Sequence, residues 1–456
     1  MYASRCYQLF LSLSTTEKKT LAGLIQAYAV RKDTFSLYTY FLENYTNSLK
    51  KLEISRISQA LKLSEAALRN ILSDLAHCIE KLLVQNVLDT NKAMHLYYLT
   101  EELQNKGLEK YSLQALEELR KESNMDKYTD WIWKYATEKL TQELVYQKKR
   151  TTNSNYQACI DTLDSFYSME KIKLAIYTNS HQALFNVPYK HTLLEEAIAI
   201  LQAGSPIPLV ALYLAAYSFQ KNPSIEHYDA LEHTIHVHAS SIPFEELQKL
   251  YLILINLGIT EMNKGEEAYI IKLFTGYQYG VNKGYLYIEN KYISRFTYTN
   301  VIVMGLRLKE YENTYRIIED WKSLLETQYA EMIYTYNLAR YYYEVQEYKK
   351  ALKLLANRQY DDTHTELAAK GILVKIYYEI QDWDSLEYTL QNLKMYLSRK
   401  DVTDYYKNIY TNFVLFTSKL LDCNARNVQE VLLKIQETPL IIHKDWLLLQ
   451  IQKIQS

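Results

Sequence analysis

Glycine and proline are both scarce in this chain, which has 10 glycines and 6 prolines among 456 residues. Average usage of about 7% and 5% would give roughly 32 and 23. Both residues are unfavourable inside helices and mark turns. A chain with so few of them must spend most of its length in helix, so the composition predicts an all-α fold.

Cysteine is also sparse. The four cysteines, Cys6, Cys78, Cys159 and Cys423, are far apart and form no CxxC pair. This spacing argues against a disulfide scaffold and against a cysteine-rich metal site. It favours a reducing compartment, and we expect a cytoplasmic protein.

The chain has almost no excess of either charge, because its 52 basic and 53 acidic residues leave a formal net charge of −1. Nucleic-acid-binding domains usually carry a basic excess or a basic face, so the whole-chain charge does not favour such a partner. The sequence also lacks HExxH, GxxxxGK[ST], GxSxG and a Rossmann glycine pattern. We therefore expect a non-enzymatic protein with no cofactor and no evident small-molecule substrate.

Apolar residues at helical spacing fill most of the chain. Residues 1–150 are expected to form an N-terminal helical domain, in which Ser14-Thr15-Thr16-Glu17 predicts a capping box. The polar stretch KKRTTNSNY, residues 148–156, is the best linker candidate. Residues 156–456 are expected to form an α-solenoid of helical hairpins, in which neighbouring hairpins cover each other's apolar faces.

One uncharged run, residues 197–220, has the length of a membrane span, but Gly204, Pro206 and Pro208 interrupt it. A spanning helix needs about 20 apolar residues without a break. Two buried helices joined by a turn fit the run better. The N-terminus does not have the pattern of a signal peptide either, so we expect no membrane span.

A repeat appears in the C-terminal half when Tyr311, Tyr348 and Trp383 are aligned, at spacings of 37 and 35 residues. An acidic residue precedes each aromatic. Small or apolar residues recur at fixed offsets after it, as Ala351 and Leu355 do after Tyr348. Together with Leu338-Ala339 and Tyr342, this middle unit resembles the tetratricopeptide repeat, a helix-turn-helix unit of about 34 residues. Gly305, Thr314 and Leu386 depart from the usual choices in the units on either side.

Nearly the whole chain also resembles a widespread, uncharacterised family of Bacteroidota helical proteins. The resemblance rests on LRNILSDLAHCIEKLL (68–83), LYLILINLGITEMNKGEEAYIIKLF (250–274), VIVMGLRLKEY (301–311) and LAAKGILVKIYYEIQDWDSLE (367–387). It implies an all-helical bacterial protein and carries over no activity.

The repeat resemblance implies that the first helix of each hairpin lines a concave groove. We expect the groove to bind a protein or peptide segment, so that the chain acts as an adaptor or scaffold. Asn300 and Asn337 fall at one repeat position, and Arg340 and Lys375 at another, as in clamps that hold a peptide backbone or a terminal carboxylate. The expected groove residues are Asn300, Arg307, Asn337, Arg340, Tyr343, Lys375 and Tyr378. Ordinary solvated residues, balanced by Glu344 and Glu379, remain the alternative.

Two further interpretations stay open. Residues 54–75 could form either a helix-turn-helix hairpin that contacts nucleic acid or a structural hairpin. In the first case, the exposed residues of its second helix would include Glu65, Arg69, Asn70 and Asp74. The segment HYDALEHTIHVH, residues 227–238, is dense in potential metal ligands. His233 and His236 could share a helix face there, which makes them weak candidates for a metal-dependent enzyme.

Overall fold

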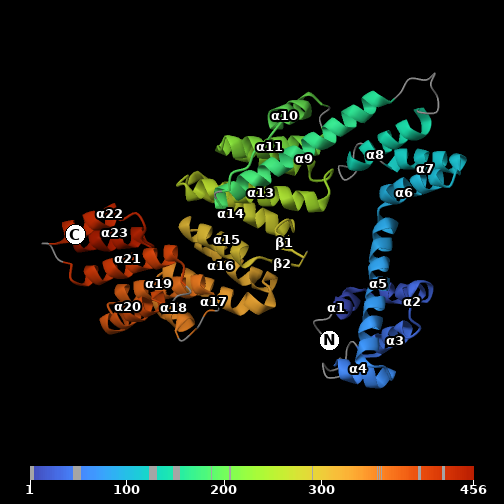
Figure 1. The fold of residues 1–456 in the computed structure, drawn as a ribbon. Helices are drawn as coiled ribbons and strands as arrows, with labels where there is room; N and C mark the ends of the chain where they lie inside the picture. Colours follow the sequence, from blue (N-terminus) through green and yellow to red (C-terminus); the bar gives the residue numbers. More distant parts are fainter. Residues whose placement is uncertain are drawn as a thin grey trace. The chain divides into compact units, whose positions relative to one another are not determined.

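The computed structural model of the chain describes residues 5–44, 53–122, 131–146, 155–185, 187–204, 207–289, 291–356, 358, 360, 362–398, 402–423 and 427–455. Nearly all of them lie in α-helices, so the predicted all-α fold is confirmed (Figure 1). Within these ranges the strands are limited to β1 (Tyr287–Ile288) and β2 (Tyr292–Ile293), a short antiparallel pair.

The chain divides into two compact units, Met1–Ile207 and Pro208–Ser456. The first unit extends beyond the domain boundary suggested near residue 150, because α9 packs against α8 and α10. The linker candidate at 148–156 lies almost wholly outside the described residues. The helices of the first unit are α1 (Arg5–Ser12), α2 (Thr15–Tyr28), α3 (Thr34–Asn44), α4 (Ile54–Leu61), α5 (Glu65–Thr90), α6 (Lys92–Asn105), α7 (Glu109–Glu122), α8 (Trp131–Thr141), the π-helical turn η3 (Gln142–Tyr146), α9 (Tyr156–Phe185) and α10 (Leu194–Ala203).

The helices of the second unit are α11 (Pro208–Lys221), α12 (Ile225–His238), α13 (Phe244–Asn263), α14 (Ala268–Asn282), α15 (Arg295–Arg307), α16 (Tyr311–Asp320), the 3₁₀ turn η4 (Trp321–Leu324), α17 (Thr327–Glu344), α18 (Tyr348–Leu355), α19 (Thr363–Glu379), α20 (Trp383–Leu397), α21 (Asp404–Leu421), α22 (Val428–Glu437) and α23 (Lys444–Gln455).

The start of α2 confirms the predicted capping box. The Ser14 hydroxyl accepts the Glu17 amide at 3.2 Å, and the Glu17 carboxylate accepts the Ser14 amide at 2.7 Å. Two amide groups at the helix N-terminus that would otherwise lack partners are satisfied in this way.

The uncharged run at 197–220 forms two helices, as its glycine and prolines predict. Helix α10 ends at Ala203 and α11 begins at Pro208. Among the described helices, none is both long and apolar enough to cross a bilayer.

The aligned aromatics each begin the second helix of a hairpin: Tyr311 begins α16, Tyr348 begins α18 and Trp383 begins α20. The same turn precedes all three, because Lys309, Gln346 and Gln381 have φ values of 59°, 62° and 59°. In each turn, the amide of the residue before the aromatic donates to the carbonyl five residues earlier: Glu310 to Gly305, Glu347 to Tyr342 and Asp382 to Tyr377, at 2.8–2.9 Å. This 6→1 bond is the C-terminal cap of the first helix in each hairpin, so the sequence period corresponds to a repeated structural unit.

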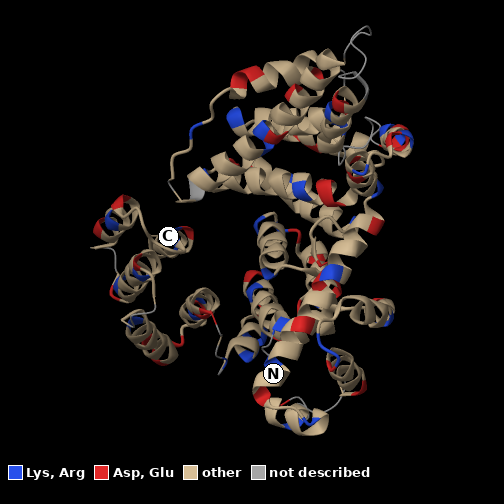
Figure 2. Cartoon of the chain, turned by 45° about the vertical axis from the view of Figure 1, so that its right-hand side comes forward, with Lys and Arg blue, Asp and Glu red and all other residues tan. Residues whose placement is uncertain are grey.

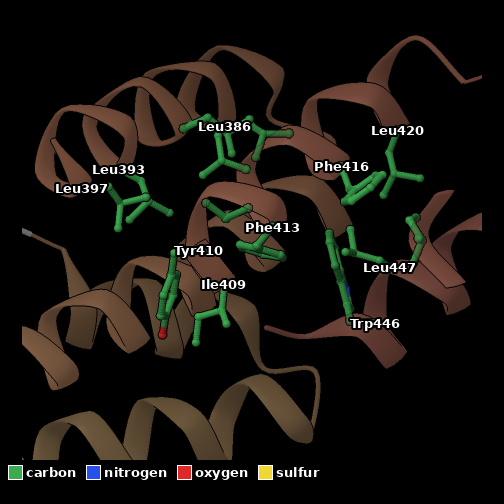
Figure 3. Packing of buried hydrophobic residues seen from close by; sticks show 14 of the residues in the cluster. Leu386, Leu393, Leu397, Ile409, Tyr410, Phe413, Phe416, Leu420, Trp446 and Leu447 are labelled. Carbon is green, nitrogen blue, oxygen red and sulfur yellow. The ribbon is translucent and has the colours of Figure 1, made fainter. Parts of the chain in front are cut away.

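The first helices of these hairpins lie next to one another, since α15 contacts α17 and α17 contacts α19. At the C-terminal end of the unit, α21 forms part of a buried hydrophobic cluster. Its Ile409, Tyr410, Phe413 and Phe416 pack with leucines of α20 and with residues of α23 (Figure 3). These helices carry the residues of the candidate site.

Position 305 requires a residue without a side chain, because α15 approaches its neighbours closely at that point. A Cβ atom there would overlap Thr314 Oγ1 and stand 2.8 Å from Phe274 Cε2. We therefore expect Gly305→Ala to destabilise the second unit by about 2 kcal/mol through overpacking, measured by urea unfolding. Adding Thr314→Ala should recover part of the loss. A stability of Gly305→Ala within about 0.5 kcal/mol of wild type would contradict this account of the glycine.

Candidate peptide-binding site

Lys375 is the least expected residue among those predicted for the groove, because it is buried. It lies on α19 with 7% of its surface exposed, and its ammonium sits 4.1 Å from the centroid of the Tyr343 ring on α17. No hydrogen bond or salt bridge joins this ammonium to any residue that the structure describes. Buried lysines are rare unless they are paired, so this one needs an explanation.

The charges around Lys375 do not compensate for its burial. Burial lowers the pKa of Lys375 to about 8; the Glu344 carboxylate opposes this shift, Arg340 adds to it and Glu379 opposes it. Glu344 is exposed at the end of α17. The interior position therefore favours the neutral amine more than any described interaction favours the ammonium.

Glu379 is already engaged by α23. Its carboxylate accepts hydrogen bonds from Trp446 Nε1 at 3.0 Å, Gln450 Nε2 at 2.7 Å and Lys453 Nζ at 3.1 Å. The sequence suggested that Glu379 could balance the charge of Lys375. The structure shows no direct ion pair between these two described residues, because the Glu379 carboxylate bonds to α23.

His443 completes the surroundings of Lys375 and Arg340, and sequence reasoning missed it. It precedes α23 with φ 56°, and its ring lies 5.2 Å from that of Phe413. Its Nε2 is buried without a hydrogen-bond partner, at a spot where a Cβ on Gly371 would stand 2.9 Å away. Burial, with the charges of Lys375 and Arg340, holds the pKa of His443 well below 6.5, so its ring is neutral at pH 7.

Two buried tyrosines extend the same cluster. Burial raises the pKa of Tyr336 on α17, and the nearby Arg340 lowers this pKa by a smaller amount. Burial likewise raises the pKa of Tyr410 on α21, with smaller contributions from Tyr336 and Tyr406 that raise it and from Arg340 that lowers it. Arg340 and Tyr343 themselves are half-buried, so the cluster reaches the protein surface through them. We call Arg340, Tyr343, Lys375 and His443 the basic cluster.

The other predicted groove residues lie in contacts within the chain. Asn300 Nδ2 donates to the Tyr277 hydroxyl at 3.1 Å. Asn337 is fully buried, and its Nδ2 donates to Thr299 Oγ1 at 3.1 Å and to the Ile333 carbonyl at 2.9 Å. These bonds join α15 to α14 and α17 to α15, so both amide groups bind neighbouring helices.

Arg307 and Tyr378 are also outside the basic cluster's contacts. Arg307 pairs with Glu267 at 3.9 Å on the surface. Tyr378 packs edge-on against Trp383 and Trp446, with centroid distances of 5.6 and 5.3 Å. Of the seven predicted residues, the structure brings together Arg340, Tyr343 and Lys375.

A large pocket of the second unit lies elsewhere, between α18, α19 and α20. It has a volume of about 830 Å³, and Arg358, Lys370, Tyr388 and Asn392 are among its lining residues. Neither Arg340 nor Lys375 lines it. The buried unpaired ammonium is the more specific feature, because an open surface hollow of mixed polarity does not select a ligand.

The weak metal candidates His233 and His236 lie on α12. The His236 ring packs 4.4 Å from the Tyr279 ring. Burial lowers the pKa of His236, and the charges of His233 and Lys283 add to the effect. No group of three or more potential ligands is close enough to hold a metal ion in the part of the chain that the structure describes.

The helix-turn-helix interpretation of residues 54–75 needs one correction. Glu65, Arg69 and Asn70 are exposed on α5 as expected, but Asp74 is 6% exposed. Its carboxylate accepts hydrogen bonds from the amides of Val30 and Arg31 and from the Thr34 hydroxyl. These bonds stabilise the start of α3. Figure 2 shows basic and acidic residues interspersed along the helices of the chain. A nucleic-acid interface would need a basic face.

Comparisons with protein families, with curated proteins and with solved structures find no match to this chain.

Proposed function

We propose that this protein is a non-enzymatic adaptor or scaffold, whose second unit binds a carboxylate-bearing protein segment at the basic cluster. The observation that carries the proposal is Lys375, a buried ammonium on a tyrosine ring with no acceptor among the described residues. The repeated hairpins α15–α16, α17–α18 and α19–α20 support a tetratricopeptide-like array. Arrays of this kind offer extended surfaces to their partners.

A ligand carboxylate would supply what the cluster lacks. An ammonium removed from water is unfavourable until an anion or a set of hydrogen-bond acceptors compensates it. Arg340 would contribute charge-assisted hydrogen bonds to the same carboxylate. The half-buried Tyr343 ring offers apolar area to the ligand's side chains.

The proposal predicts that partner binding requires the charges of Arg340 and Lys375. The Arg340→Ala/Lys375→Met double variant should reduce recovery of the dominant partner by roughly ten-fold or more in quantitative affinity purification from the native host, because both charged contacts to a desolvated carboxylate are lost. Methionine keeps the length of the lysine stem, so the packing around α19 should be preserved.

The matched control is Arg316→Ala/Lys349→Met, which makes the same two changes at exposed positions on α16 and α18. It should leave partner recovery at the wild-type level. If both double variants recover the partner equally well, the basic cluster is not the binding site. Circular dichroism and thermal melting check that each variant remains folded.

A further inference from the structure

Helix α9 carries an exposed apolar stripe along most of its length. We call Tyr156, Ile160, Leu163, Tyr167, Leu174 and Tyr177 the α9 seam. Each of these side chains is 41–57% exposed. Their spacings of 4, 3, 4, 7 and 3 residues follow an alternating a/d heptad pattern, in which Glu170 occupies the one remaining position. The seam spans 22 residues, or about 32 Å of helix.

The opposite side of α9 is already covered by its own unit. Met169, Ile172, Ala175 and Ile176 are at most 1% exposed, and α9 packs against α8 and α10. Figure 1 shows α9 as one long, uninterrupted helix. A surface helix normally has one apolar face and one polar face. Helix α9 has two apolar faces, and within the part of the chain that the structure describes only the face opposite the seam is covered.

We propose that the α9 seam is a self-association surface, which pairs antiparallel with the α9 seam of a second copy of this chain. An isologous contact between two copies would bury both seams around one two-fold axis. The knobs of one seam would fill the holes of the other, as in a short coiled coil. This proposal concerns the first unit and does not depend on the peptide site.

The position of Glu170 favours the antiparallel direction. In a parallel, in-register pair, the two copies of Glu170 would meet at the same core layer, and like charges facing each other are destabilising. In the antiparallel pair, Leu163 of one copy faces Leu174 of the other, and Glu170 faces Tyr167. Glu170 also contacts Lys173 of its own helix at 3.3 Å, which further reduces the penalty of placing it at the seam.

The flanking charges favour the same arrangement. Asp164 is exposed beside the seam in the N-terminal half of α9, and Lys171 lies beside it in the C-terminal half, 5.9 Å from the centroid of the Tyr167 ring. Both occupy e positions of the heptad. An antiparallel pair brings e positions together, so Asp164 of each copy faces Lys171 of the other, twice per dimer. In a parallel pair these charges would face Cys159 and Phe166.

The mass of the full-length chain in solution, measured by sedimentation velocity over a concentration series, tests the proposal. The wild type should dimerise. Leu174→Asp should raise the dimer dissociation constant roughly 100-fold or more, because each dimer would bury two new charges. Leu174 is 56% exposed, so the fold of the single chain should be unaffected. The matched control is Leu433→Asp on α22, where the leucine is 55% exposed, and it should dimerise as the wild type does.

Charge reversal tests the direction of the pair. Asp164→Lys and Lys171→Asp should each weaken the dimer roughly ten-fold, because each creates two like-charge contacts. Combining them should restore the wild-type dissociation constant, because the two charges exchange places. A wild-type chain that is monomeric at every concentration, a dimer that survives Leu174→Asp, or a charge-reversed double variant that is weaker than both single variants would overturn the proposal.

Discussion

Replacing Lys375 by methionine is expected to stabilise the second unit by about 3 kcal/mol at pH 7. The folded chain holds this amine at a pKa of about 8, against 10.5 for an unperturbed lysine. Each unit of difference corresponds to about 1.4 kcal/mol of preference for the neutral form. Methionine fills similar space and has no charge to desolvate, so the penalty disappears. Urea unfolding of both chains at pH 7 measures the difference.

The stabilisation by Lys375→Met should depend on pH in a defined direction. The lysine pKa is lower in the folded chain than in the unfolded chain, so between pH 8 and pH 10.5 the unfolded chain binds more protons, and wild-type stability gains with rising pH. The advantage of the methionine variant should therefore fall from about 3 kcal/mol at pH 7 to about 1.4 kcal/mol at pH 9.5. Titration of the buried tyrosines affects both chains alike and cancels in the difference.

Lys349→Met provides the control for this prediction, because Lys349 is exposed on α18. It should change stability by less than about 0.5 kcal/mol at every pH. If Lys375→Met were destabilising at pH 7, the ammonium would have a compensating partner within the chain, and the argument for a ligand would fail. A stabilising Lys375→Met that also loses the partner would mean that this position sacrifices stability for binding.

Asp74→Ala is expected to destabilise the first unit by about 3 kcal/mol, because it leaves three donors without their acceptor. Asp74 accepts the Val30 amide at 3.2 Å, the Arg31 amide at 3.0 Å and the Thr34 hydroxyl at 2.6 Å. Asp74→Asn keeps one of the two acceptor oxygens and should lose about half as much. Thermal and urea unfolding of the first unit's transition measure both effects.

The pH dependence of the Asp74 contribution has the same direction as that of Lys375, because folding lowers both pKa values and wild-type stability rises with pH, but it lies in the acidic range. Burial raises the pKa of Asp74, but the hydrogen bonds from Thr34, Arg31 and Val30 outweigh burial and leave it below 3.8. A lowered carboxyl pKa stabilises the fold at neutral pH, and the contribution is lost as pH falls through the folded value. Asp89→Ala, at an exposed position of the same helix, should be nearly neutral. Equal stabilities of the Asp74 and Asp89 variants would show that the start of α3 does not depend on this carboxylate.

The fold class and several local features could be predicted because local physics determines them. Scarcity of glycine and proline implied helices. The Ser14–Glu17 spacing located the start of α2, and the aligned aromatics located the starts of α16, α18 and α20. In each case the interacting groups lie within a few residues of one another, so their spacing in the sequence carries the information.

The composition of the candidate site could be predicted only in part. Arg340 and Lys375 share a repeat position, Tyr343 lies one helical turn after Arg340, and the repeat placed the three on neighbouring helices. Nothing in the sequence indicated that Lys375 is buried, since burial depends on how α21 and the segment before α23 pack over α19. His443 is 68 residues beyond Lys375 and outside the aligned repeats, so no spacing rule connects them.

The two asparagines show why repeat position alone does not define a ligand contact. Asn300 and Asn337 are equivalent in the alignment, and both sit on first helices of hairpins. Their amides bond to Tyr277 on α14 and to Thr299 on α15, because the neighbouring helices are close enough for these side chains to reach across. The same proximity of neighbouring helices also lets these amide groups bond within the chain, where they do not face a ligand.

The central claim is that a ligand carboxylate binds at Arg340 and Lys375. The most direct measurement is calorimetric titration of the purified chain with a synthetic segment of the recovered partner, with the segment's carboxylates either free or converted to amides. Wild type and Arg340→Ala/Lys375→Met are each titrated with both forms. Amidation should weaken binding to the wild type roughly 100-fold. It should have little further effect on the double variant, because the interacting groups are coupled. Equal affinities of the free and amidated segments for the wild type would contradict the claim.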